Sequence, residues 1–122
     1  MKLTPWILLL VVIVLAVAAF VWTSQQSAVK LTTPYQAVLL TNGSVYYGKV
    51  EGLGKPYPIL RDVFYIQTAV DQNTKQTSNV LIRRGKEWHG PDYMVLNANH
   101  ILLVEPVTQG SRVAQLIAAA AK

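Results

Sequence analysis

The sequence predicts a mainly β protein: one N-terminal transmembrane α-helix, then a small antiparallel barrel of five or six strands, and a short C-terminal helix. Three observations lead to this fold class. Residues 6–22 are apolar without exception, residues 35–107 alternate β-rich runs with turn residues, and residues 111–122 are rich in helix formers. We therefore divide the 122 residues into an anchor (1–24), a tether (25–34), a β-barrel domain (35–107) and a helical tail (108–122).

The anchor is predicted from the segment "WILLLVVIVLAVAAFVW", residues 6–22. Seventeen helical residues span about 25 Å, and their neighbours extend the segment toward the thickness of a hydrocarbon core. No charge occurs between Lys2 and Lys30, and Trp6 and Trp22 close the two ends, where indole rings prefer the headgroup level of a bilayer. We expect this helix to contact membrane lipid.

Two other structures for this segment compete with a retained anchor. A buried core helix is disfavoured because the rest of the chain is too small to surround an apolar rod of this length. A cleaved signal peptide has support from the basic start and from "AVA" at residues 16–18. The apolar run continues to Trp22, beyond a usual signal core, and this favours an uncleaved anchor.

The charges beside the helix predict its orientation. Lys2 and the amino terminus precede it, whereas only Lys30 lies close after it. The positive-inside rule then places the N-terminus in the cytoplasm and the β domain on the exported, periplasmic side. The absence of cysteine excludes a disulfide scaffold and a thiolate metal site.

The β domain is predicted strand by strand. The expected strands are residues 35–41, 44–52, 59–70, 80–84, 93–97 and 100–107. Asn42 and Gly43 predict a type I′ hairpin turn, and Gly48 inside the second strand predicts a bend or bulge. The polar segment 71–79 is expected to be a hairpin loop. Because an open sheet leaves two bare edges, we expect closure into a small barrel.

The tail is predicted to be a short helix. Ser111 is the candidate N-cap, and Val113, Leu116 and Ile117 follow at helical spacing.

Three short motifs carry a family resemblance. Asn42–Gly43 ends one strand in "VLLTNGSVYYGKVEG", Gly48 lies at the bend of the next, and Arg84–Gly85 closes a later strand in "VLIRRGKE". Together with "HILLVEPV", this plan resembles the Sm-like (SH3-like) small barrels over residues 38–107, and the resemblance implies the barrel shape. The family's RNA pocket uses an acidic-x-x-x-Asn element, and Asp62 lacks that asparagine here, so no RNA-binding residue is carried over.

A membrane helix is foreign to the Sm-like family. With its helix, the chain looks similar to small single-pass bacterial proteins, which implies the bacterial inner (cytoplasmic) membrane and brings no known activity.

The net charge of +5 is scattered apart from "RRGK", residues 83–86. Arg83, Arg84 and Lys86 form a solvated strand end in one interpretation. In the other, with Trp88, they contact anionic lipid headgroups or an acidic partner surface. Nucleic-acid binding is not expected of an exported domain.

No constellation predicts an enzyme. Glu87, His89 and Asp92 are close enough in sequence to suggest a metal site, but one histidine and two carboxylates on a loop are weak ligands, so we expect a solvated loop anchored by Trp88. His100 is expected to cap a turn. Phosphate-binding and hydrolase motifs are absent from the sequence, and we predict no metal and no cofactor.

The helix also lacks chemistry of its own. It carries no ionisable group for a transport path, but Ala16, Ala18 and Ala19 make one part of it small enough for a neighbouring helix to approach closely.

These observations favour a non-catalytic accessory subunit of a larger membrane protein complex, such as a respiratory or photosynthetic one, with the helix packing laterally and the barrel capping the exported side. One alternative is a free-standing tethered module that recognises a peptide or polymer. Another is a cytoplasm-facing barrel that binds nucleic acid or forms rings, as the Sm-like resemblance would allow.

Overall fold

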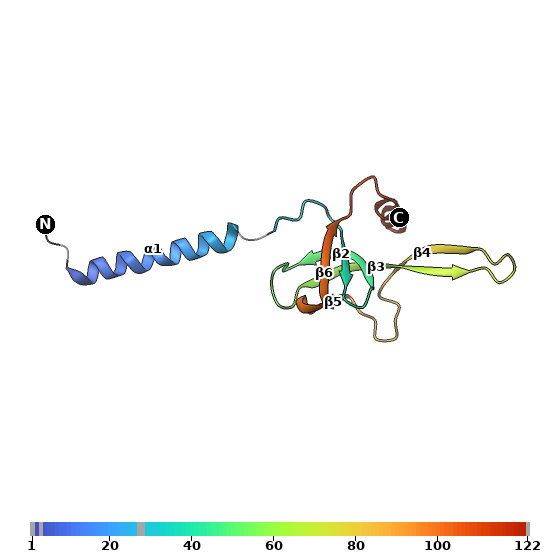
Figure 1. Cartoon of the computed structure of the whole chain (residues 1–122), viewed down its shortest axis with the longest axis horizontal. Coiled ribbons are helices and arrows are strands. Elements are labelled where there is room, and N and C mark those ends of the chain that lie inside the picture. The colour runs from blue at the N-terminus through green and yellow to red at the C-terminus, as the bar shows by residue number, and fades with distance from the viewer. Residues whose placement is uncertain (1, 3, 27–28, 122) are drawn as a thin grey trace. The chain divides into compact units, whose positions relative to one another are not determined.

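The computed structural model describes residues 2, 4–26 and 29–121. The chain divides into two compact units, residues 1–30 and residues 31–122, and we call the second unit the β domain (Figure 1). Part of the predicted tether, residues 27 and 28, lies outside the described residues, as does Lys122 at the end of the predicted tail.

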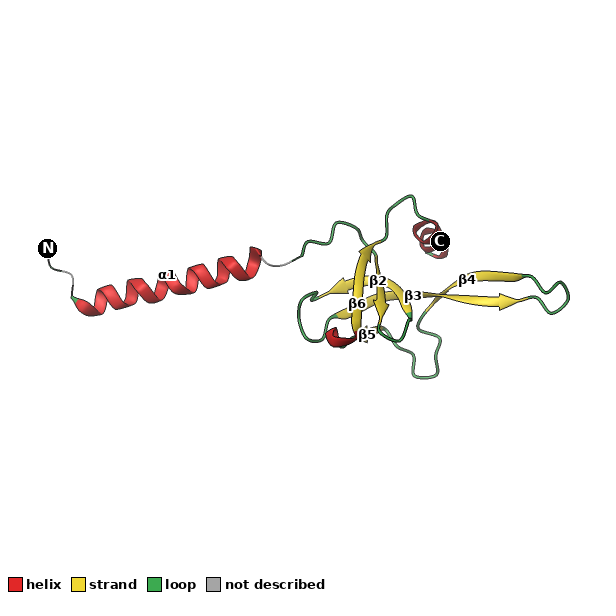
Figure 2. Ribbon diagram, viewed as in Figure 1, coloured by secondary structure: helices red, strands yellow, loops and turns green. Residues whose placement is uncertain are grey.

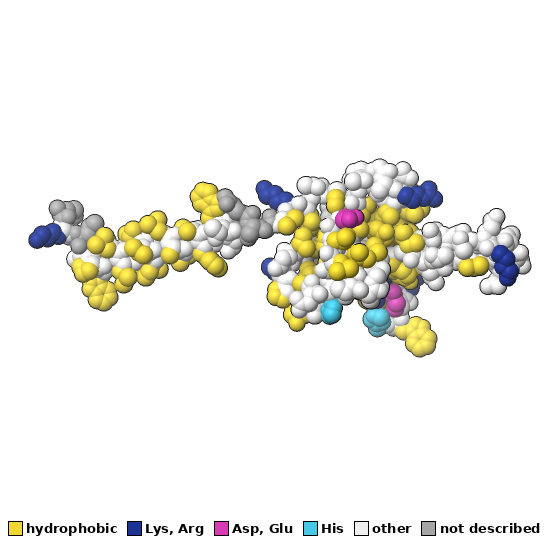
Figure 3. Space-filling view, viewed as in Figure 1, with side chains coloured by type: hydrophobic (Ala, Val, Ile, Leu, Met, Phe, Trp, Pro, Cys, Tyr) yellow, Lys and Arg dark blue, Asp and Glu magenta, His cyan; other side chains and the backbone are white. Residues whose placement is uncertain are grey.

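The first unit is built on helix α1, Pro5–Gln26. Pro5 occupies the first helical position, where its missing N–H costs no hydrogen bond. Within α1, Pro5–Ser24 is long and apolar enough to cross a membrane, and a secretory signal sequence would meet the same test of length and composition. Hydrophobic side chains cover the visible face of α1 in Figure 3.

The β domain contains one six-stranded antiparallel sheet, which confirms the mainly β class (Figure 2). Its strands are β1 (Gln36–Leu40), β2 (Val45–Glu51), β3 (Ile59–Val70), β4 (Thr77–Arg83), β5 (Tyr93–Val95) and β6 (Ile101–Pro106). They follow the order β4-β3-β2-β1-β6, and β5 pairs with the first half of β3. A 3₁₀ turn, η1 (Ala98–His100), leads into β6, and helix α2 (Arg112–Ala120) ends the described chain.

The prediction that this sheet closes into a barrel is wrong. Among the described strands, β4 and β6 end the sheet and do not pair with each other. The reason lies in β3, whose first residues pair with β2 and β5 while its second half, from Phe64 to Val70, pairs with β4. The second half leaves the rest of the sheet, so β4 cannot reach β6.

The predicted bend at Gly48 is confirmed. Tyr47 pairs with Phe64 and Lys49 with Arg61, so one residue of β2 stands opposite two residues of β3. A side chain at Gly48 would have no room, because a Cβ atom there would lie 2.7 Å from the carbonyl oxygen of Arg61. This bulge is the point where the two strands change direction together.

The predicted type I′ turn between β1 and β2 is wrong. Gly43 has a φ of +86°, whereas Asn42 is not among the described residues with positive φ. The Gly43 N–H donates to the carbonyl of Leu40, and the Leu40 N–H donates to the carbonyl of Ser44. This pattern is a longer hairpin loop with glycine in the left-handed position, and it needs positive φ at one residue only.

A small core fills the bent sheet. The buried side chains Val38, Leu60, Val63 and Leu96 pack together, and the half-buried neighbours Leu40, Tyr46, Val50, Met94, Ile101 and Val104 surround them. Ser111 caps helix α2 as predicted, and its Oγ accepts a hydrogen bond from the Ala114 N–H. Its buried residue is Ile117, so α2 covers the domain with one face.

Beyond the core, the second half of β3 and its partner β4 project as a two-stranded hairpin (Figure 1). We call residues 65–82 the hairpin arm. Strand β4 begins at Thr77, three residues earlier than predicted, and pairs Thr77 with Val70. In the loop at the tip, Asp71 Oδ1 accepts hydrogen bonds from the N–H groups of Asn73 and Thr74.

Candidate functional site

The predicted basic segment lies at the root of the hairpin arm, beside a groove of about 410 Å³. Its lining comes from β3, from the end of β4 with the two residues that follow it, and from β5 with the two residues that precede it. Its described lining is Arg61, Asp62, Val63, Arg83, Arg84, Gly85, Pro91, Asp92, Tyr93 and Met94. We call it the arginine groove.

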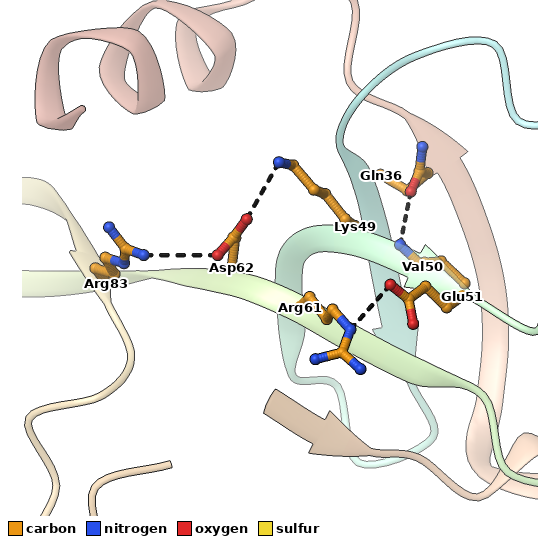
Figure 4. A network of polar contacts seen from close by, with 7 residues as sticks. All are labelled: Gln36, Lys49, Val50, Glu51, Arg61, Asp62 and Arg83. Carbon is orange, nitrogen blue, oxygen red and sulfur yellow. Dashed lines mark hydrogen bonds and ion pairs between the residues drawn. The ribbon is translucent and has the colours of Figure 1, made fainter. Parts of the chain in front are cut away.

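Each arginine of the arginine groove has a carboxylate partner. Arg83 Nη2 lies 3.5 Å from Asp62 Oδ1, and Arg61 Nε lies 2.9 Å from Glu51 Oε1 (Figure 4). The other oxygen of Asp62 lies 3.2 Å from Lys49 Nζ, and this hydrogen bond raises the pKa of Lys49. The side chains in these pairs are well exposed, so their contribution to stability is small.

The loop after β4, residues 84–92, is braced from within. Arg84 Nε lies 3.2 Å from Glu87 Oε1, and the other carboxylate oxygen accepts the Gly85 N–H at 2.9 Å. The Gly85 N–H is the main cause that lowers the pKa of Glu87, and the Arg84 guanidinium adds to it. Gly85 and Gly90 have φ values of +132° and +57°, which favour glycine at both ends of the turn.

Trp88 lies at the outer part of this loop and is fully exposed to solvent. The prediction that Trp88 anchors the loop is therefore wrong, because the anchoring contacts come from Glu87 and the indole ring packs on nothing. We call residues 85–90 the Trp88 loop. A fully exposed tryptophan is unusual, since this large amphipathic ring is normally well buried.

The structure brings together only part of the predicted cationic site. Arg83 and Arg84 line the arginine groove, whereas Lys86 and Trp88 lie outside its described lining. Lys86 makes no ion pair with any residue that the structure describes. Because Arg83 and Arg84 are paired with carboxylates, the segment is less basic than its sequence suggests. Among the described residues Lys86 is its one cation without an ion pair, and the exposed Trp88 lies two positions further along the chain.

The other predicted site residues stay apart. Trp6 and Trp22 are exposed near the two ends of α1. Ala16, Ala18 and Ala19 lie on α1, and the first and third share a face because they are three residues apart. Their roles in lipid contact and helix packing remain predictions.

The histidines take no part in a described metal site. In the part of the chain that the structure describes, no three His, Asp or Glu side chains are grouped so that they could hold a metal ion. Glu87 is held by Arg84 and Gly85. His100 Nδ1 lies 3.3 Å from Thr41 Oγ1, beside the turn between β1 and β2.

Sequence reasoning missed a second groove at the base of the hairpin arm. It has a volume of about 400 Å³ and lies where β2 and β3 diverge, lined by Gly43, Ser44, Val45, Tyr46, Tyr47, Tyr65 and Ile66. We call it the tyrosine groove. The convergence of its three tyrosines depends on how β2 and β3 separate beyond the bulge at Gly48, and this pairing of distant residues is not encoded in a local pattern.

Comparison of the chain with protein-family models and with curated proteins finds no match.

Proposed function

We propose that the protein is a non-catalytic, single-pass accessory subunit of a larger membrane protein complex. In this proposal α1 is a retained anchor in the bacterial inner membrane, its N-terminus is cytoplasmic, and the β domain lies on the exported side. The β domain docks on another subunit through the Trp88 loop. The exposed indole of Trp88 is the observation that carries the proposal.

The chemistry of the Trp88 loop supports docking on a protein. Tryptophan is enriched at the centres of protein interfaces because its ring fills a pocket while its N–H donates a hydrogen bond. The brace from Arg84 and Gly85 to Glu87 fixes the loop beforehand, which lowers the entropy lost on binding. Lys86, which is unpaired among the described residues, adds attraction toward an acidic partner surface.

The surface of α1 supports the same proposal. Every described side chain of α1 is exposed within its own unit, and the helix between Lys2 and Lys30 holds no charged residue. Lipid and neighbouring apolar helices are the surroundings that such a surface fits.

The test is to extract the full-length chain from its native membrane with a mild detergent and separate complexes on a native gel. We expect the chain to migrate with a larger assembly. The substitution Trp88→Ala should weaken this association by about 2 kcal/mol, roughly thirtyfold, as for other buried interface tryptophans. Trp88→Phe should retain part of it.

The matched control is His89→Ala, which shortens the neighbouring exposed side chain of the same loop. A chain that runs as a lone monomer in every mild detergent contradicts the proposal. So does an assembly that Trp88→Ala and His89→Ala weaken equally.

The tyrosine groove favours a second candidate function, a tethered module that binds an extended peptide or a polymer. Three tyrosines line it, and Tyr46 and Tyr65 meet edge to face with ring centroids 6.4 Å apart. Aromatic walls of this kind suit stacking on sugar rings or on proline-rich segments. Retention of the full-length chain on such a polymer, abolished by Tyr65→Ala, would favour this candidate.

A further inference from the structure

Among the described strands, none pairs with the two outer edges of the hairpin arm, and most of their length carries none of the usual protection. Outside its tip, the arm segments 65–70 and 77–82 contain no charged residue and no proline. Folded proteins normally guard exposed strand edges with lysine, proline or a covering segment, because unpaired N–H and C=O groups recruit other strands. Moreover, a two-stranded hairpin by itself is marginally stable in water.

The hydrogen-bond pattern shows which groups of β4 point outward. The Arg84 N–H donates to the Val63 carbonyl, and at the other end the Asp71 N–H donates to the Gln76 carbonyl. Hydrogen-bonded and non-hydrogen-bonded pairs alternate along an antiparallel ladder. Val80 therefore bonds inward to β3, while the N–H and C=O groups of Asn79 and Leu81 face the free edge.

We propose that β4 pairs antiparallel with β4 of a second copy of this chain, about a two-fold axis at Val80. In this register the two Val80 residues form the close, non-hydrogen-bonded pair, and Asn79 of each copy exchanges hydrogen bonds with Leu81 of the other. The proposal uses a different surface from the Trp88 loop and does not depend on the proposed function.

Three observations make a second copy the fitting occupant. Val80 is 49% exposed, and β-branched residues paired across strands stabilise a sheet. When the two Val80 residues lie opposite each other, Arg83 of one copy lies opposite Thr77 of the other, so no like charges face each other across the two strands. Helix α2 contacts β4, but Thr77–Val80 remains exposed, and joining two arms turns each marginal hairpin into part of a four-stranded sheet.

The chain has no cysteine, which permits a direct test. In the full-length protein in mild detergent, Val80→Cys should form a disulfide-linked dimer under gentle oxidation, since the paired Cα atoms would be about 4.5 Å apart, within disulfide reach. The matched control is Gln67→Cys. Gln67 pairs with Val80 on the same face of the arm, but would lie three strand spacings, about 14 Å, from its own copy.

We expect Val80→Cys to cross-link at least about tenfold faster than Gln67→Cys, because only the first pair meets disulfide geometry. Adding Asn79→Pro removes an outward N–H and leaves the backbone ladder between β3 and β4 intact, although it also removes the side-chain hydrogen bond from Thr68 Oγ1 to Asn79 Oδ1. This double variant should cross-link no faster than Gln67→Cys. Circular dichroism of the double variant should match that of Val80→Cys, which checks that it is folded.

Equal rates for the two cysteines would overturn the proposal. A Val80→Cys adduct with a different protein, in place of the homodimer, would overturn the choice of a second copy.

Discussion

Gly48 illustrates how one residue sets the shape of this sheet. A Cβ atom at this position would lie 2.7 Å from the Arg61 carbonyl oxygen and 2.9 Å from Leu60 Cγ. The sequence pointed to a bend here, because glycine inside a strand marks a bulge or a close backbone approach. The close contact is between Gly48 in β2 and the backbone of β3, so it can be recognised only once the pairing of the two strands is known.

We predict that Gly48→Ala destabilises the β domain by about 1–3 kcal/mol, since the neighbouring backbone must shift to admit the methyl group. Thermal unfolding of the full-length chain in mild detergent, followed by near-ultraviolet circular dichroism, should show a lower midpoint. Gly110→Ala is the control, because nothing lies within 4 Å of a Cβ atom there. Identical midpoints for the two variants would contradict the prediction, because they would mean that the backbone of the bulge admits the methyl group without loss of stability.

Asp62 is the residue that sequence reasoning could not place. It has a φ of +50°, which is uncommon for any residue except glycine, although Asp and Asn tolerate it best. In sequence it is an ordinary member of the longest β-rich run. In the structure it lies opposite Gly48 and bridges Lys49 and Arg83, so its backbone and its side chain both serve the bend.

Gln36 is a buried polar residue at the start of β1, and both ends of its side chain are satisfied. Its Nε2 donates to the Thr33 carbonyl at 2.6 Å. Its Oε1 accepts the Val50 N–H at 2.9 Å (Figure 4). The Gln36 side chain thus takes the place of a backbone carbonyl as the partner of the Val50 N–H, at the point where β1 and β2 separate. No sequence pattern distinguishes this glutamine from the exposed Gln67.

At the scale of elements, the loop after β4 was predicted in position and misjudged in its internal support. Because tryptophan is usually largely buried, the sequence predicts Trp88 as the anchor of this loop. The actual support is the Glu87 carboxylate, which binds Arg84 and the Gly85 N–H. This contact depends on the left-handed backbone of Gly85, which precedes Glu87. It holds the loop in place while Trp88 stays exposed, and this arrangement can be seen only in the folded loop.

This support makes the loop sensitive to pH. Because the folded loop lowers the pKa of Glu87 below its ordinary value of 4.5, the ionised side chain stabilises the loop at neutral pH. That contribution is lost as the pH falls through the lowered pKa. The amide proton of Gly85, followed by NMR during acid titration, should shift upfield with a midpoint below 4.5.

The matched variant for this titration is Glu87→Gln, which keeps the shape of the side chain and removes the carboxylate. It should abolish the shift of the Gly85 amide. A midpoint at or above 4.5 in the unsubstituted chain would contradict the bracing described for this loop.

The hairpin arm shows the limit of reading strands from apolar residues. Strand β4 begins with Thr77, Ser78 and Asn79, which read as a polar loop, and the structure pairs all three with β3. Alternation of apolar and polar residues reports burial of one face. An arm exposed on both faces has no such alternation, so only the ladder itself defines it.

At the scale of the whole molecule, the proposed location of the protein depends on α1. We predict that Ile13→Arg, at the middle of the helix, raises the free energy of membrane insertion by about 2.5–3.5 kcal/mol. A smaller share of the chain should then remain in the membrane pellet after alkaline carbonate extraction. Thr4→Arg, just before the helix, is the control and should have little effect.

The intact mass of the membrane-extracted chain provides a second readout. A chain that still carries residues 1–24 is the expected species. A mature chain that begins after the "AVA" at residues 16–18 would instead identify α1 as a cleaved signal.

The sequence by itself determined the apolar helix, the antiparallel β class, the bend at Gly48 and the Ser111 cap. Each of these depends on a local periodicity or on the stereochemistry of one residue. The tertiary structure decided that the sheet stays open, that Asp62 lies at the bulge opposite Gly48, and that Trp88 is exposed. Those features depend on which strands meet, and strand pairing is set by contacts between residues far apart in the chain, which no local pattern encodes.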